Sequence, residues 1–211
     1  MVQNVERVDA VLTAAPVVPV LIIEDAKKAV PMAKALVAGG LPAIEITLRT
    51  DAAMEAIRAV ASEVEGAMVG AGTVLNAEQY DKAAKAGSTF IVSPGATANL
   101  LHVADGHNVP LLPGATSASE SMFLLEHGYV RQKFFPAEPA GGVPFVKALS
   151  SPLSAIKFCP TGGITAQNAP DYLKLPNVIC VGGSWIASPD LINAEAWDQI
   201  EANARAACAL S

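Results

Sequence analysis

The stretch AIEITLRTDAAMEAIRAVASEV, residues 43–64, carries the pattern that decides the fold. Its first half alternates, so that Ile44, Ile46 and Leu48 share one face of a strand and the residues between them share the other. Its second half places apolar residues, including Met54 and Ile57, at the spacing of one helix face. The stretch therefore predicts a strand that is followed directly by an amphipathic helix.

The same strand–helix unit recurs along the whole chain. Short runs rich in valine and isoleucine alternate with alanine-rich segments of helical period. The eight runs are residues 17–23, 43–48, 67–70, 90–92, 110–112, 130–134, 156–159 and 178–181. Strands that alternate with helices in this way predict an α/β protein with parallel strands.

Eight units predict a single domain over residues 1–211 that folds as a closed (β/α)8 TIM barrel. Residues 2–12 have helical character, and we expect them to form a short N-terminal helix that plugs the bottom of the barrel. An open doubly wound sheet is the alternative. It is disfavoured because its dinucleotide-binding version begins with a glycine-rich turn, whereas the first strand here ends in IIED, residues 22–25.

The composition excludes several classes of protein. The chain is 52% hydrophobic and 16% charged, which rules out a disordered protein. Its longest apolar stretch, residues 11–23, contains two prolines and is shorter than the roughly 20 residues of a membrane span. A net charge of −6 without a basic run offers no surface to nucleic acid or to an anionic membrane. Three cysteines without metal-binding spacing, and no signal peptide, predict reduced and mostly buried thiols in a cytoplasmic protein.

Two ionisable residues of the alternating strand bear on function. If Ile44 and Ile46 pack under the helices, then Glu45 and Arg49 point toward the barrel interior and its mouth. A buried carboxylate without a partner would cost several kcal/mol, so Glu45 needs a reason to be there. Either Glu45 and Arg49 merely satisfy each other, or they belong to a functional site.

A lysine is expected on the opposite side of the barrel. In VRQKFFP, residues 130–136, Lys133 and Phe135 share one face, and this strand lies opposite the strand of Glu45 in a ring of eight. Phe135 and Pro94 would wall the lysine and reduce its hydration, which favours the neutral amine that acts as a nucleophile. A purely structural lysine–glutamate pair is the alternative.

Two glycine pairs predict an anion site. They follow strands seven and eight in PTGGI, residues 160–164, and VGGSW, residues 181–185. Glycine lets backbone amides converge on an anion, and barrels of this class bind phosphate in these two loops. We expect Gly162, Gly163 and Ser184 to hold a phosphate, although the glycines could also serve only as tight turns.

Other candidate groups are less well placed. Lys157 is a rival to Lys133, but it lies nearer the bottom of the barrel, and active sites of this fold occupy the opposite rim. Strand three ends in GAGTVLN, residues 70–76, where we expect the glycines to bring backbone close to a ligand and Thr73 to offer a hydroxyl. The three histidines lie away from the strand ends and form no ligand set, so we expect no metal and no cofactor.

Taken together, the motifs resemble a known family. They are EITLRT (45–50), VGAGTVLN (69–76), SPG (93–95), KFFPAE (133–138), FCPTGGI (158–164) and VGGSW (181–185). In order and over nearly the whole chain they are similar to the 2-keto-3-deoxy-6-phosphogluconate (KDPG) aldolases, bacterial class I aldolases that can also act on 4-hydroxy-2-oxoglutarate. The resemblance implies a cytoplasmic homotrimer of the Entner–Doudoroff pathway that splits KDPG into pyruvate and glyceraldehyde 3-phosphate.

The resemblance also implies roles for individual positions. Lys133 would be the Schiff-base lysine and Glu45 the acid and base. Arg49 and Thr73 would bind the pyruvyl carboxylate, and Thr161 would bear on the stereochemistry at the attacked carbon. The other substrate-binding positions are Pro94, Phe135, Gly162, Gly163 and Ser184.

Two other functions remain open at this stage. One is an isomerase or epimerase of a sugar phosphate, which would use acid–base groups alone and form no covalent adduct. The other is a catalytically silent sensor, which would bind the same sugar-acid phosphate without turnover. Release of pyruvate and a trapped lysine adduct distinguish the aldolase from both.

Overall fold

The strands of the computed structural model are all paired in parallel, as predicted. The model describes residues 3–210, so Val2, where the expected N-terminal helix begins, lies outside the described residues. The strands within that range are β1 (Val17–Leu21), β2 (Ala43–Thr47), β3 (Met68–Gly72), β4 (Phe90–Val92), β5 (Leu111–Leu112), β6 (Gly114–Ala115), β7 (Arg131–Phe134), β8 (Lys157–Pro160) and β9 (Val181–Gly183). The α/β class is confirmed, because these strands alternate with helices along the chain.

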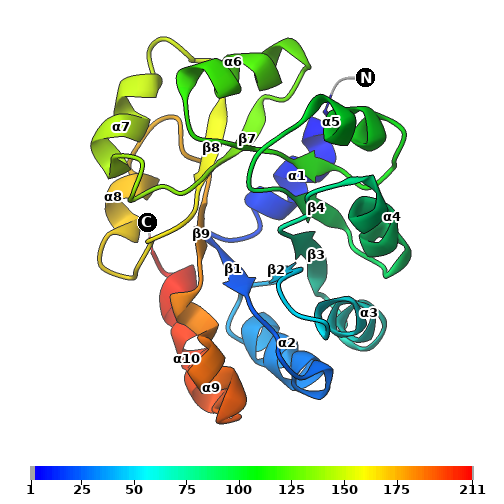
Figure 1. The fold of residues 1–211 in the computed structure, drawn as a ribbon. Helices are drawn as coiled ribbons and strands as arrows, with labels where there is room; N and C mark the ends of the chain where they lie inside the picture. Colours follow the sequence, from blue (N-terminus) through cyan, green and yellow to red (C-terminus); the bar gives the residue numbers. More distant parts are fainter. Residues whose placement is uncertain (1–2, 211) are drawn as a thin grey trace.

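The strands form two sheets. One has six strands in the order β5-β4-β3-β2-β1-β9, and the other has three in the order β6-β7-β8. Only Pro113 separates β5 from β6, and single bridges join Phe158 to Val178 and Thr161 to Gly182. Figure 1 shows the strands in the middle of the molecule, with the helices outside them.

The predicted runs and the observed strands differ at two places. The last run, 178–181, shares only Val181 with β9. The run 110–112 continues past Pro113 into a second short strand, β6. Proline has no backbone N–H to give to a ladder, so it divides the strand there. Gly114 follows because a side chain at this position would overlap the carbonyl of Pro94.

Most of the helices follow strands and cover the outer faces of the sheets (Figure 1). They are α1 (Val5–Leu12), α2 (Ala29–Ala38), α3 (Ala53–Glu63), α4 (Ala77–Lys85), α5 (Ala98–Asp105), α6 (Ala118–Glu126), α7 (Gly142–Leu149), α8 (Ala169–Leu173), α9 (Pro189–Asn193) and α10 (Trp197–Cys208), with 3-10 turns at Ala26–Lys28 and Trp185–Ala187. Among residues 3–210, no helix is both long and apolar enough to cross a membrane.

Two apolar clusters correspond to the two faces of the strands. The larger lies between strands and helices and contains Ile44 and Ile46, as the alternation predicts. The smaller lies inside, on the other face, and combines strand residues such as Val18 and Phe90 with the apolar face of α1. The predicted N-terminal helix is thus confirmed over Val5–Leu12, and it covers one end of the strand assembly.

Candidate active site

Glu45 of β2 and Lys133 of β7 meet inside the molecule, as the alternation predicts. Lys133 Nζ lies 3.1 Å from Glu45 Oε1 and 3.4 Å from Oε2. Lys133 is 5% exposed and Glu45 is 3% exposed, so the pair is almost completely shielded from water. At this distance a proton can pass directly between the amine and the carboxylate.

Lys133 is also the better placed of the two candidate lysines. Its Nζ lies 5.4 Å from the ring centroid of Phe135, which leaves the strand two residues later. Lys157 stands at the start of β8 and donates a hydrogen bond to the carbonyl of Pro176. Lys157 is therefore at the strand end remote from the glycine turns, whereas Lys133 lies nearer to them.

Arg49 and Thr73 form a second contact at the same end of the strands. Arg49 Nε donates to Thr73 Oγ1 over 3.3 Å. Thr73 adopts a φ of 59°, in the left-handed region that a β-branched residue rarely occupies. Such backbone strain is typical of functional sites and here aims the threonine hydroxyl at the arginine.

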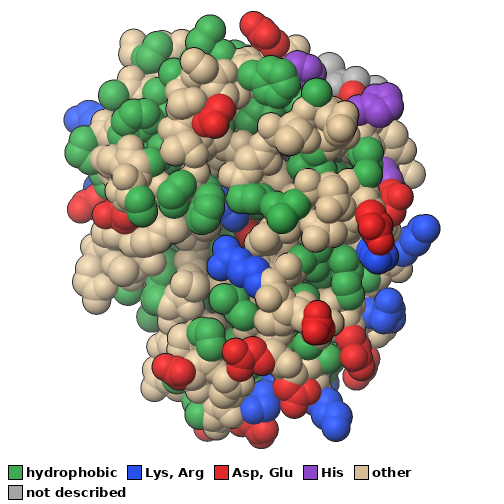
Figure 2. Space-filling view, viewed as in Figure 1, with side chains coloured by type: hydrophobic (Ala, Val, Ile, Leu, Met, Phe, Trp, Pro, Cys, Tyr) green, Lys and Arg blue, Asp and Glu red, His purple; other side chains and the backbone are tan. Residues whose placement is uncertain are grey.

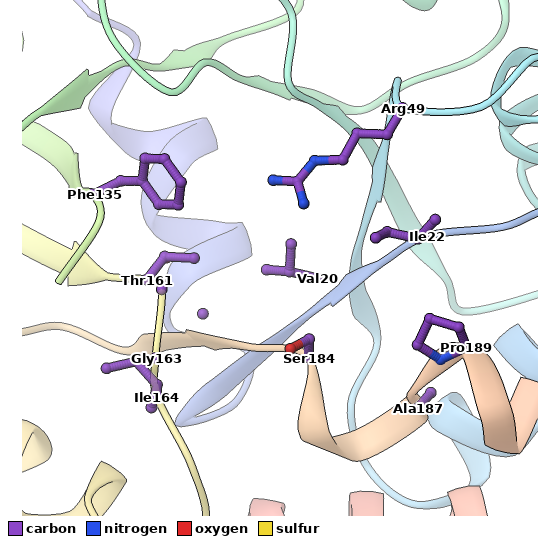
Figure 3. Close-up of a pocket in the computed structure, with 12 residues that line it drawn as sticks. Val20, Ile22, Arg49, Phe135, Thr161, Gly163, Ile164, Ser184, Ala187 and Pro189 are labelled. Atoms are coloured by element: carbon purple, nitrogen blue, oxygen red, sulfur yellow. The ribbon is translucent and has the colours of Figure 1, made fainter. Parts of the chain in front are cut away.

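A cavity of about 200 Å³ opens beside these residues. Figure 3 shows the guanidinium of Arg49 reaching into it, with Phe135 and Thr161 on the facing side. Six of the predicted residues line the cavity, namely Arg49, Phe135, Thr161, Gly162, Gly163 and Ser184. In the space-filling view, basic side chains lie in the central hollow, whereas most acidic side chains, together with further basic ones, lie toward the periphery (Figure 2).

The sequence reasoning missed the apolar part of the lining. It consists of Val20, Ile22, Ile164, Ala187 and Pro189. Val20 and Ile22 are two residues apart at the end of the first predicted strand, so the same alternation that placed Glu45 could have found them.

The glycine turns have a packing role besides the predicted anion role. Gly162 and Gly163 have φ values of 99° and 78°, which favour glycine. A side chain at Gly182 would overlap Oγ1 of Thr161, so this glycine lets β8 and β9 approach closely. Ser184 is exposed at the edge of the cavity (Figure 3). The turns are therefore tight, as one alternative from the sequence has it, and they border the cavity, whereas the anion role stays a prediction.

The comparisons with known proteins agree on one family. The family model described as KDPG and KHG aldolase matches residues 8–203. The chain belongs to this aldolase family. A 2-dehydro-3-deoxy-phosphogluconate aldolase of Pseudoalteromonas atlantica is 50% identical over 94% of this chain and 93% of its own length. A KHG/KDPG aldolase of Escherichia coli K12 is 49% identical over the same shares.

Solved structures of the aldolase family have the same fold. A KDPG aldolase from Legionella pneumophila, with pyruvate captured as a covalent carbinolamine intermediate, is 43% identical with a TM-score of 0.93, covering 95% of this chain and 98% of that one. A Zymomonas mobilis aldolase with 3-phosphoglycerate is 49% identical with a TM-score of 0.90, covering 97% and 96%. The chain is accordingly a carbon–carbon lyase.

Two predictions about the aldolase site need correction or refinement. The glycines of β3, expected to bring backbone close to a ligand, also have a packing role: a side chain at Gly70 would meet the ring of Phe90, and one at Gly72 would overlap the carboxylate of Glu45. Pro94 does not line the cavity, and instead its carbonyl packs against Gly114, the β6 partner of Lys133. Its place is beside the lysine strand.

The histidines lie outside the cavity lining, as predicted, whereas Cys159 is the β8 partner of Lys133 and its Sγ lies 4.0 Å from Thr161 Oγ1. Cys159 and Cys180 are buried free thiols, whereas Cys208 is exposed. A hydrogen bond with Cys159, followed by burial, raises the pKa of the Cys180 thiol well above its ordinary value. His107 pairs with Asp81 at 2.7 Å on the outside of the fold. Within residues 3–210, no three histidine, cysteine or acidic side chains come together as a metal site.

Proposed function

We propose that the chain is a class I aldolase that cleaves KDPG to pyruvate and glyceraldehyde 3-phosphate through an imine on Lys133. Its second reaction would be the cleavage of 4-hydroxy-2-oxoglutarate to pyruvate and glyoxylate. One observation carries the proposal: Lys133 Nζ and Glu45 Oε1 lie 3.1 Å apart and buried. Neither of them lines the cavity into which Arg49 reaches, but Phe135, whose ring centroid lies 5.4 Å from Lys133 Nζ, does and so connects the pair to it. A purely structural ion pair would need no such cavity.

The pair supplies both groups that imine formation requires. Transfer of the ammonium proton of Lys133 to Glu45 leaves a neutral amine, which attacks the C2 carbonyl of the substrate to give a carbinolamine. Glu45 then returns the proton to the departing hydroxyl, which leaves as water and yields a protonated imine. The imine is the electron sink for the next step.

Carbon–carbon cleavage uses the carboxylate again. Glu45, now ionised, takes the proton of the C4 hydroxyl, the C3–C4 bond breaks, and its electron pair moves into the imine to form an enamine. The aldehyde leaves, C3 of the enamine is protonated, and water hydrolyses the resulting imine to pyruvate and free Lys133. No step requires a metal or an organic cofactor.

The surrounding residues would orient the substrate along the cavity. Arg49 suits the pyruvyl carboxylate because its planar fork can bind two oxygens, with Thr73 holding the arginine and adding a hydroxyl. Thr161 would bear on the stereochemistry at the attacked carbon. The phosphate would bind at the other end, to the backbone of Gly162 and Gly163 and to Ser184. Phe135 and Pro94 would keep the lysine strand poorly hydrated.

We further propose that residues 1–211 form one domain in which the two sheets close into a (β/α)8 barrel. Two features support closure. The bridges Phe158–Val178 and Thr161–Gly182 connect β8 and the residue after it to β9 and the residues before it, and only Pro113 separates β5 from β6. The working form would be a homotrimer, as the family resemblance implies. The large apolar side chains that remain exposed on the single chain would be available to its interfaces, namely Leu75, Met122, Phe123 and Phe145. A cytoplasmic location in the Entner–Doudoroff pathway fits the neighbouring free thiols of Cys159 and Cys180.

A coupled assay of pyruvate release tests the function. We expect the wild type to release pyruvate from both keto acids. Ser184→Ala should raise KM for KDPG by roughly 10- to 150-fold, because a hydrogen bond to a charged group contributes about 1.5–3 kcal/mol. It should leave KM for unphosphorylated 4-hydroxy-2-oxoglutarate unchanged, and the surface variant Ser62→Ala should change neither.

Other outcomes would point elsewhere. An equal loss on both substrates would mean that the turn of Ser184 is structural. Conversion of a sugar phosphate without pyruvate would favour the isomerase, and ligand binding without turnover would favour the sensor.

A further inference from the structure

The segment that follows Lys133 is hydrogen-bonded to the glycine turn after β8. Beyond the end of β7, Ala137 N donates to Thr161 O over 2.8 Å and Glu138 N donates to Gly162 O over 3.0 Å. The chain from the lysine strand therefore runs alongside the turn that we assign to phosphate. Any shift of residue 138 would be passed directly to the backbone of that turn.

Glu138 supports the turn with its side chain as well. A Cβ atom placed on Gly163 would lie 2.6 Å from Cβ of Glu138 and 2.8 Å from its Cγ. The stem of the glutamate thus packs directly against the glycine backbone. Gly163 is a glycine both because its φ is 78° and because Glu138 occupies the space that a side chain would take.

The carboxylate of Glu138 is anchored by a buried tyrosine. The hydroxyl of Tyr172, on α8, donates a hydrogen bond to Glu138 Oε1. The tyrosine is 0% exposed, and burial, followed by the hydrogen bond and the charge of Glu138, raises the pKa of its phenol. Tyr172 therefore remains a protonated donor throughout the neutral range. Gly142, at the start of α7, leaves room for the pair, since its Cβ would lie 3.3 Å from Glu138 Oε1.

We propose that Glu138 and Tyr172 form a positioning pair that sets the Gly162–Gly163 turn for a phosphate and thereby determines the preference for phosphorylated substrates. The proposal rests on the phosphate site assigned above. Glu138 contacts the turn through its backbone and its stem, and Tyr172 contacts Glu138, so the pair acts through the turn and not on the reacting atoms.

Two physical effects give the pair its selectivity. The packed stem and the backbone hydrogen bonds fix the direction of the turn amides, which an anion needs and an uncharged substrate end does not. The tyrosine also holds the carboxylate in one place, because a free negative charge next to the turn would repel the phosphate. Loss of the anchor should therefore weaken phosphate recognition and spare imine chemistry.

Tyr172→Phe tests the pair, because it removes the hydroxyl and keeps the buried ring. We expect KM for KDPG and the inhibition constant of inorganic phosphate to rise together by roughly 3- to 10-fold, as for one partly lost hydrogen bond to a charged group. The kcat value, the KM for 4-hydroxy-2-oxoglutarate and borohydride trapping with pyruvate should not change. Tyr80→Phe is the matched control, since Tyr80 is also 0% exposed and its hydroxyl donates to Val109 O, away from the site.

A second pair of variants separates shape from charge. Glu138→Gln keeps the stem and an acceptor for Tyr172, so it should retain most of the affinity for phosphate, whereas Glu138→Ala should lose it. If Tyr172→Phe leaves KM for KDPG unchanged, or raises KM for both substrates alike, the positioning pair is wrong. Ser184→Ala separates this failure from failure of the phosphate site: a selective effect of Ser184→Ala alone would retain the site and remove only the pair.

Discussion

Gly72 illustrates how the site depends on residues that carry no chemistry. A Cβ atom at this position would overlap Glu45 Oε1 and lie 2.7 Å from Glu45 Cδ. The carboxylate therefore fills the space that a larger residue at this position of β3 would occupy. The sequence alone predicts that this glycine brings backbone close to a ligand. It does not reveal the contact with Glu45, because that residue comes from a neighbouring strand.

The close contact between Gly72 and Glu45 predicts that adding a single methyl group at residue 72 affects catalysis. Gly72→Ala should displace the Glu45 carboxylate and lower kcat by about 10- to 100-fold, part of the 10²–10⁴ that a positioned acid or base contributes. Labelling by pyruvate and borohydride should persist, since Lys133 remains. Steady-state kinetics measures the effect, and Gly106→Ala is the control because its Cβ would come no closer than 3.5 Å to any atom. Full activity of Gly72→Ala would show that Glu45 does not need this wall.

At the scale of elements, α1 shows how much of the fold the sequence predicts. Its apolar face, with Val8, Val11 and Leu12, is buried against the inner face of the strands. Strand and helix types follow from periodicity, which is local. The ends of the strands do not, because Pro113 divides one strand and the space at Gly114 depends on Pro94 from a neighbouring strand. Tyr172 escaped notice for the same reason, since its partner Glu138 is distant in sequence.

Leu12→Ala tests the role of α1 as a plug. Leu12 is 2% exposed, so its truncation should lower the free energy of unfolding by about 2–5 kcal/mol through lost burial and a residual cavity. The KM and kcat values at low temperature should be unchanged, because α1 covers the end of the strands away from Arg49 and the glycine turns. Urea denaturation measures the free energy of unfolding, and the pyruvate assay measures KM and kcat. A decrease of less than about 1 kcal/mol in the free energy of unfolding would mean that the packing of α1 against the strands contributes little to stability.

At the scale of the whole molecule, the net charge is negative but the charge in the central hollow is basic. The chain carries a net charge of −6, yet the central hollow in Figure 2 holds basic side chains. In the proposed function, attraction for an anionic substrate would thus be local and would come from Arg49 and the backbone of the turns. Sequence motifs predict most of these residues, whereas Val20 and Ile22 belong to no motif, and only the alternation of their strand places them on the cavity side.

The arrangement of possible metal ligands in the molecule makes a prediction about metal dependence. Since the part of the chain from residue 3 to residue 210 brings no three suitable side chains together, we expect activity to survive exhaustive EDTA treatment and dialysis. The pyruvate assay, before and after treatment, measures this. Loss of activity with recovery on adding a divalent ion would indicate an enolate stabilised by metal, and would overturn the imine mechanism.

The central claim is that Lys133 forms the imine. Borohydride added with pyruvate should reduce that imine to a stable secondary amine, and peptide mapping by mass spectrometry should find the adduct on Lys133 alone. Lys133→Ala should abolish labelling and turnover, while Glu45→Gln should retain some labelling and lose most cleavage. An adduct on Lys157, or pyruvate release without any adduct, would contradict the account.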